Sequence, residues 1–146
     1  MDSPTTTVLR IEAWPDAVID RLGFTPTSAY FEWLWLPQIG PSTAWAYRRL
    51  TSGLDARPDG YELSVPELAG WLGLGGTVRN SPVVRSLQRL VQFQLALQVD
   101  GATLAVRRRV PPLSLRQLKR LSPHLQRTHT HLTDATRRSA MEAEAS

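Results

Sequence analysis

The chain has 146 residues, enough for one compact domain with a hydrophobic core and short for two. Hydrophobic residues make up 42% and charged residues 21%, which is typical of a folded protein rather than a disordered one. The absence of cysteine excludes disulfide bonds, thiolate metal ligands and cysteine catalysis. No run approaches the roughly 18 apolar residues of a membrane span, and MDSPTTTVLRIE lacks the layout of a signal peptide. We therefore expect a cytoplasmic protein without a membrane partner.

The positive charge is concentrated in the second half of the chain. Residues 1–60 contain five basic and seven acidic residues, whereas residues 61–140 contain twelve basic and four acidic ones. Of the 17 basic residues 16 are arginine, a bias that the codon usage of a high-GC genome can produce. The distribution is therefore more informative than the abundance. A basic second half favours an anionic partner, most commonly nucleic acid.

The first predicted elements form an N-terminal extension. Residues 7–14 (TVLRIEAW) predict a short strand, and residues 15–22 predict a short helix that a proline opens and a glycine follows. SAYFEWLWLP predicts a second helix, with Ser28 as its N-cap and Pro37 as its terminator. This helix is apolar nearly all round, which indicates deep burial or a partner surface. We place residues 1–39 as an extension packed on the core.

The pattern becomes clearer over residues 40–110. The expected elements are a helix from Pro41 to about Gly53, a strand through Tyr61 and Leu63, a helix over PELAGWLGL, a helix from a Ser81 cap to about Leu95, and two strands around Asp100–Gly101. An Asp-Gly pair between alternating apolar residues is the strongest short-range signal of a hairpin. This order indicates an α+β fold that is mostly helical.

The remaining residues predict a C-terminal helix and a tail. The helix covers residues 111–133 and is kinked or restarted at Pro123. Residues 134–146 are small and polar, so we expect a flexible, frayed tail. The helix also carries an apolar stripe that could pair two copies in a homodimer, formed by Leu115, Leu118, Leu121 and Leu125.

Three stretches carry a resemblance to a known family: ELAGWLGL, SPVVRSLQRLVQF and LALQVDGATLAVRRR. Together they resemble the scaffold helix, the recognition helix and the two wing strands of winged helix-turn-helix DNA-binding proteins. The resemblance implies a transcriptional regulator that places the helix over residues 81–95 in the major groove and the wing over residues 96–109 on the DNA backbone. It also implies a homodimer. The whole chain looks like small winged-helix proteins of high-GC bacteria, which supplies no activity.

The helix over residues 81–95 separates into an apolar and a basic side. With Leu87 at the centre of the buried side, an advance of 100° per residue places on the other side Arg85, Arg89 and Gln92, with Ser81 and Gln88 at its margin. These arginines could be ordinary solvated surface residues. However, no acidic residue lies between Glu67 and Asp100, so neither arginine has a carboxylate partner at helical spacing. This favours contact with DNA bases, because arginine matches guanine and glutamine matches adenine.

Further arginines extend the predicted basic surface. Alternation along the second wing strand places Arg107 and Arg109 on one face and Arg108 on the other. This cluster could clamp DNA phosphates, or it could protect an edge strand against aggregation, and we weigh the two about evenly. The remaining candidates lie in the turn before the recognition helix and on the last helix: Arg79 and Asn80, and Arg116, Lys119 and Arg120.

No pattern indicates catalysis, a metal or a cofactor. His124, His129 and His131 lack the spacing of three or four residues that pairs metal ligands on a helix, so they more readily solvate or cap a helix end. The glycine-rich GWLGLGG lacks the lysine and serine of a phosphate loop. We therefore expect neither an enzyme nor a cofactor.

The chain is rich in tryptophan, with three of five tryptophans before residue 40: Trp14, Trp33 and Trp35, followed by Trp45 and Trp71. Trp33 and Trp35 either bury against the core or form a dimer or partner interface. The second choice leads to an alternative function, a non-enzymatic adaptor in which a winged-helix scaffold binds an acidic protein. Salt dependence separates the two functions, because DNA binding releases counterions.

Overall fold

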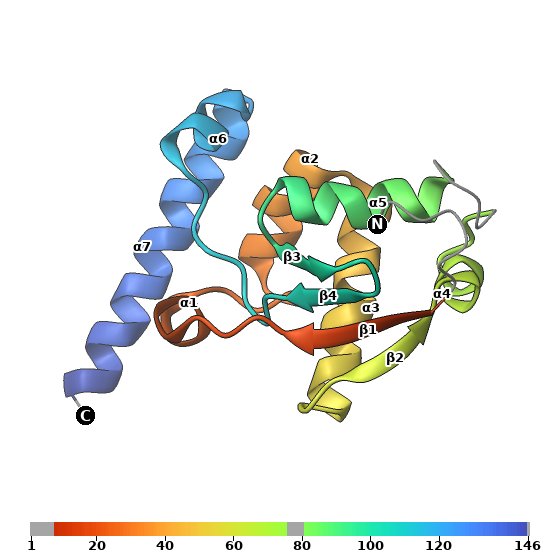
Figure 1. Ribbon diagram of the computed structural model, residues 1–146. Helices are drawn as coiled ribbons and strands as arrows, with labels where there is room; N and C mark the ends of the chain where they lie inside the picture. The colour runs from red at the N-terminus through yellow and green to blue at the C-terminus, as the bar shows by residue number, and fades with distance from the viewer. Residues whose placement is uncertain (1–7, 76–80, 146) are drawn as a thin grey trace.

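A small sheet and the helices packed on one of its faces make an α+β fold in the computed structural model, which describes residues 8–75 and 81–145 (Figure 1). In chain order the elements are β1 (Val8–Ala13), α1 (Ala17–Leu22), a π-helical segment (Phe31–Trp35), α2 (Leu36–Ile39), α3 (Pro41–Ala56), β2 (Tyr61–Ser64), α4 (Val65–Trp71), α5 (Pro82–Gln92), β3 (Ala96–Asp100), β4 (Thr103–Val106), α6 (Leu115–Arg120) and α7 (Pro123–Ala145). The expected α+β class, dominated by helices, is confirmed.

The N-terminal strand is an inner strand of the sheet. The strand order is β2-β1-β4-β3, in which β1 is antiparallel to β2 and parallel to β4, and β3 and β4 form a hairpin. Ile11 of β1 lies opposite Tyr61 of β2 and Leu104 of β4. The strand predicted at residues 7–14 is therefore confirmed, and the segment interpreted as an extension supplies part of the central sheet.

Alternation along β1 shows which face of the sheet is buried. Leu9 and Ile11 are fully buried, whereas Val8 and Arg10 are exposed. Helix α3 lies behind the sheet and α5 runs beside it in Figure 1. Residues of α3, α4 and α5 join the buried face of the sheet in one core that contains Leu50, Leu68 and Leu87.

The helix expected to end at Pro37 continues past it. Ser28 Oγ accepts a hydrogen bond from the Phe31 N–H at 3.2 Å, as expected of an N-cap. In the π-helical segment that follows, the Leu36 N–H donates to the Phe31 carbonyl, five residues back. Pro37 then lies at the start of α2, where a missing N–H is tolerated. The helix ends instead at Gly40, whose φ of 87° is incompatible with the helical conformation.

Helix α5 begins as expected and ends three residues early. Ser81 has the extended backbone of an N-cap, but its side chain makes no capping hydrogen bond. The helix ends at Gln92 because Gln94 adopts a positive φ of 58°. The Leu95 N–H then donates to the Leu90 carbonyl, the closing bond of a Schellman-type end.

The C-terminal region contains two helices. Ser114 and Gln117 form a capping box at the start of α6, and the expected restart at Pro123 is confirmed. Helix α7 runs along one side of the molecule and continues to Ala145, through residues where the sequence suggested a frayed tail (Figure 1). Among the residues that the structure describes, none of the helices has the length and apolarity to cross a membrane.

The apolar stripe predicted for dimer pairing packs largely within the chain. Leu121 is buried in the core, and Leu118 and Leu125 pack against it with their side chains partly covered. Leu115 alone of the four is strongly exposed, at 76%. The stripe is therefore mostly used by the fold itself.

Candidate functional site

Helix α5 presents a polar, basic side to solvent. Arg85, Arg89 and Gln92 are exposed and Gln88 is half-buried. The opposite side packs into the core through apolar residues, among them Leu87. This is the division between inner and outer sides that the sequence predicted.

The two arginines of α5 have different surroundings. Arg89 Nη2 donates to the Gln38 carbonyl at 3.4 Å, and its guanidinium lies 5.8 Å from the centre of the Phe93 ring. Arg85 makes no hydrogen bond or ion pair with any residue in the described ranges. Within those ranges neither arginine contacts a carboxylate, so both charges face outward without a counter-charge.

A buried glutamine links this side of α5 to α6. The carbonyl of Gln38 accepts from Arg89, while its side-chain Nε2 donates to the Gln117 carbonyl at 2.8 Å. A groove of about 560 Å³ follows between the end of α5 and α6, with Gln92 on one wall and two arginines of α6 on the other. We call the combined surface the α5–α6 basic face: Arg85, Arg89, Gln92, Arg116 and Arg120. The role of Gln38 could not be predicted from the sequence, because its two partners, Arg89 and Gln117, lie 51 and 79 positions further along the chain.

The arginines assigned to the wing lie at the end of the hairpin opposite its tip. Strand β4 ends at Val106, so residues 107–109 follow the strand instead of alternating along it. They lie at the end of β4 opposite the hairpin tip, about 16 Å away at the rise of an extended chain. The tip itself is formed by exposed residues 100–102, where Asp100 Oδ1 accepts from the Ala102 N–H at 2.8 Å.

Each of these three arginines is bound to another part of the chain. Arg107 forms an ion pair with Asp16 at 3.2 Å, Arg108 forms one with Asp55 at 2.7 Å, and Arg109 Nη1 donates to the Gly23 carbonyl at 3.2 Å. The edge-strand interpretation of the cluster is wrong, because β4 is an inner strand that lies between β1 and β3. Contact of these arginines with DNA phosphates stays a prediction.

The other candidates near the start of α5 do not add to this face. Ser81 is only 5% exposed, and its hydroxyl has no hydrogen-bond partner in the described structure, so it is not placed to reach a base. Arg79 and Asn80 lie outside the described residues. Lys119 is exposed on α6 but does not line the groove.

The tryptophans divide between core and surface. Trp35 is buried and its Nε1 donates to the Pro111 carbonyl at 2.9 Å. Trp33, Trp45 and Trp71 are each more than half exposed. Of the pair that the sequence assigned either to the core or to an interface, Trp35 belongs to the core and Trp33 is exposed.

The histidines do not form a group. His129 packs edge-on against the Tyr30 ring with centres 5.5 Å apart, and burial lowers its pKa. His124 and His131 are exposed. In the described part of the chain, no three histidines, aspartates or glutamates gather in a way that could hold a metal ion.

Comparison with known protein families, curated proteins and solved structures finds no match to this chain. The function therefore has to be argued from the geometry of its own residues.

Proposed function

We propose that the protein binds double-stranded DNA, with α5 in the major groove. The observation that carries the proposal is the α5–α6 basic face, where Arg85 and Arg89 are exposed on one helix and no described carboxylate pairs with them. Uncompensated arginines on a rigid helix offer bidentate donors to guanine O6 and N7. Gln88 and Gln92 on the same side offer the donor and acceptor pair that matches adenine.

The order of the elements supports a winged helix-turn-helix arrangement. Helix α3, strand β2, helices α4 and α5, and the β3–β4 hairpin follow one another as in that fold, and α5 packs on both α3 and α4. Strand β1 is an addition, since it lies between β2 and the hairpin. In this arrangement the hairpin tip, rather than residues 107–109, flanks the DNA.

The electrostatics of the helix favour an anion in front of it. Residues 82–92 contain no acidic side chain, and Arg85 lies one turn from the N-terminus, where the helix dipole is positive. A DNA phosphate would compensate both the charge of Arg85 and the partial positive charge at the start of the helix. Arg116 and Arg120, across the groove from Gln92, are suited to phosphate contacts that fix orientation without reading sequence.

The test is binding to a GC-rich duplex by fluorescence anisotropy at low and near-physiological salt. We expect salt-sensitive binding, because neutralised phosphates release counterions. Two bidentate contacts amount to a few kcal/mol, so Arg85→Ala with Arg89→Ala should weaken binding by roughly 30-fold or more. The matched control is Arg137→Ala with Arg138→Ala, which removes the same charge from an exposed part of α7. Equal affinities for the two double variants would show that α5 does not read DNA.

A second candidate, an adaptor for an acidic protein, is favoured by the exposed indoles of α3 and α4. Trp45 and Trp71 line a groove of about 450 Å³, and Arg49 lies over the Trp71 ring at 5.9 Å. Tryptophan and arginine are enriched where proteins bind one another. Absence of DNA binding even at low salt, with capture of a partner that Trp45→Ala and Trp71→Ala abolish, would establish the adaptor instead.

As a proposed regulator of transcription, the protein would read two half-sites as a homodimer. Because Leu118, Leu121 and Leu125 pack within the chain, the pairing surface would use Leu115 or the exposed aromatic residue Trp33. Sedimentation equilibrium of the wild type and of Leu115→Gln measures the oligomeric state. A dimer that the substitution dissociates would pair through Leu115, and a dimer that persists would pair through Trp33.

A further inference from the structure

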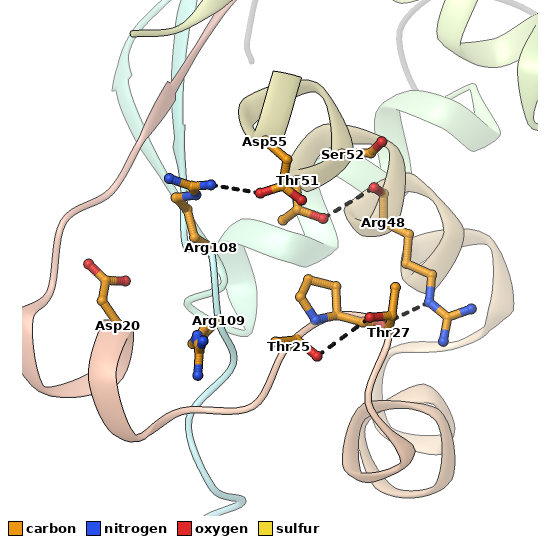
Figure 2. Close-up of a pocket in the computed structure, with 10 residues that line it drawn as sticks. Asp20, Thr25, Thr27, Arg48, Thr51, Ser52, Asp55, Arg108 and Arg109 are labelled. Atoms are coloured by element: carbon orange, nitrogen blue, oxygen red, sulfur yellow. Dashed lines mark hydrogen bonds and ion pairs between the residues drawn. The ribbon is translucent and has the colours of Figure 1, made fainter. Parts of the chain in front are cut away.

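An open pocket of about 530 Å³ lies at the base of the β3–β4 hairpin, and none of its lining residues belongs to the α5–α6 basic face. Its wall is built by four separate segments: α1, the loop that follows it, α3 and the residues after β4 (Figure 2). Its charged lining residues are Asp20, Arg48, Asp55, Arg108 and Arg109, and threonine and serine side chains line it as well. Three arginines and several hydroxyl groups therefore meet where distant parts of the sequence converge.

Each arginine of the pocket is fixed by one hydrogen bond that leaves other donors free. Arg48 Nε donates to the Pro26 carbonyl at 2.9 Å, and its guanidinium lies over the Trp45 ring at 5.2 Å. Arg108 uses Nη2 for Asp55, and Arg109 uses Nη1 for the Gly23 carbonyl. A guanidinium has five N–H donors, so the opposite donors of each fork are open to a ligand. Because the side chains are already held, an anion would bind with little ordering cost.

The charge balance of the pocket is positive. It contains three guanidinium groups and two carboxylates, of which Asp55 is already paired with Arg108. Asp20 Oδ2 accepts the Asp16 N–H at 3.1 Å, and its side chain lines the same pocket as Arg109. An anionic group next to Arg108 and Arg109 would offset the excess charge, and forked guanidinium donors match phosphate oxygens.

The remaining lining indicates what the anion is attached to. Thr25, Thr27 and Ser52 supply hydroxyl groups, which donate to and accept from sugar hydroxyls. No aromatic ring is among the lining residues, so the pocket offers no surface for stacking a nucleobase. We propose that this pocket binds a small phosphate ester of a hydroxyl-rich compound, of the sugar phosphate class.

The test is isothermal titration of the full chain with ribose 5-phosphate, ribose and inorganic phosphate. We expect saturable binding of ribose 5-phosphate, at least tenfold tighter than either of the other two probes. Arg108→Gln and Arg109→Gln should each weaken it at least tenfold. Arg21→Gln, an exposed neutralisation on α1 outside the pocket, should leave it unchanged.

The proposal would be overturned by no saturation at millimolar ribose 5-phosphate, by equal binding of inorganic phosphate, or by loss of binding in the Arg21→Gln variant as well. Circular dichroism of each variant shows that a loss of binding is not a loss of fold. The site is independent of the proposed function, so the Arg85→Ala, Arg89→Ala variant should bind the ester like the wild type. Displacement of the ester by duplex DNA would assign these arginines to the nucleic acid and also contradict the pocket.

Discussion

Arg107 and Asp16 form an ion pair at 3.2 Å that joins the end of the β3–β4 hairpin to the N-terminal cap of α1. The Arg107 guanidinium also stacks on the Trp14 ring, with 3.8 Å to its centre, and Nε donates to the Gln94 carbonyl at 2.7 Å. Only 12% of the Arg107 side chain is exposed. Arg107 therefore has a structural role: its guanidinium holds the end of the hairpin against α1 and faces the protein rather than solvent.

The first prediction concerns the acid stability that Asp16 provides. The Ile19 N–H and, with it, the ion pair to Arg107 hold the pKa of Asp16 below its ordinary value of 3.8, against the opposing effect of desolvation. A carboxyl group whose pKa is lower in the folded state than in the unfolded state stabilises the fold at a pH above its unfolded-state pKa. This stabilisation is lost as the pH falls through the folded-state pKa. Asp16→Asn should therefore unfold at a lower temperature than wild type at pH 7, and this deficit should shrink below about pH 4.

Thermal unfolding followed by circular dichroism between pH 3 and pH 7 measures this difference. Asp59→Asn is the matched control, because Asp59 is an exposed carboxylate for which the structure shows no side-chain hydrogen bond. A deficit in Asp16→Asn that stays the same at pH 3 would mean that the carboxylate charge is not the cause.

The second prediction concerns His129, through which α7 packs on Tyr30. Burial lowers the pKa of His129, so the unfolded chain binds a proton at a higher pH than the folded one. Stability contributed at this site is therefore present above the unfolded pKa, near 6.5, and is lost as the pH falls below it. His129→Phe keeps a ring against Tyr30 and should flatten the stability profile between pH 7 and pH 5. His131→Phe, an exposed control, should leave the slope as in wild type.

The third prediction concerns two glycines within helices. Glycine usually destabilises a helix by about 1 kcal/mol relative to alanine. At Gly53 of α3, however, an added Cβ would overlap the Tyr61 ring, whose hydroxyl donates to the Leu50 carbonyl at 2.8 Å. Burial raises the pKa of Tyr61 to about 12, which fits a ring held in place. Gly53→Ala should therefore destabilise the protein by roughly 1–3 kcal/mol, the usual cost of overpacking.

Gly70 of α4 is the matched case with the opposite sign. An added Cβ there meets nothing within 4 Å, so Gly70→Ala should stabilise the protein by up to about 1 kcal/mol. Urea unfolding of both variants measures the contrast. Equal effects of the two substitutions would show that the Tyr61 contact does not govern Gly53.

Local pattern was sufficient to predict several of these elements. The period of α5 is carried by adjacent turns, and the Asp100–Gly101 turn depends on two neighbouring residues, so both could be read without knowing the rest of the fold. The position of β1 in the sheet could not be predicted in this way. Tyr61 and Leu104, the partners of Ile11 in β1, lie 50 and 93 residues further along the chain. The same limit applies to Arg107. Its charge is visible in the sequence, but the aspartate and tryptophan that enclose it are brought there only by the sheet.

The candidate site shows the same division. Exposure of Arg85 and Arg89 follows from the helical period alone. The connection to α6 depends on Gln38, whose burial and two hydrogen bonds are set by the packing of α2. The pocket was also out of reach, since its lining comes from four segments that no local pattern relates.

The last prediction separates the arginines of α6 from those after β4. If Arg116 and Arg120 contact phosphates, replacing both with alanine should reduce the slope of log K against log salt by about 1.8, that is, about 0.9 for each contact. Sequence preference should be unchanged, because phosphate contacts do not read bases. Arg108→Gln with Arg109→Gln removes the same charge but should leave the slope unaltered, since these side chains line a separate pocket that shares no residue with the α5–α6 basic face. A smaller slope in the second variant than in the first would move the DNA backbone to the hairpin base and away from α6.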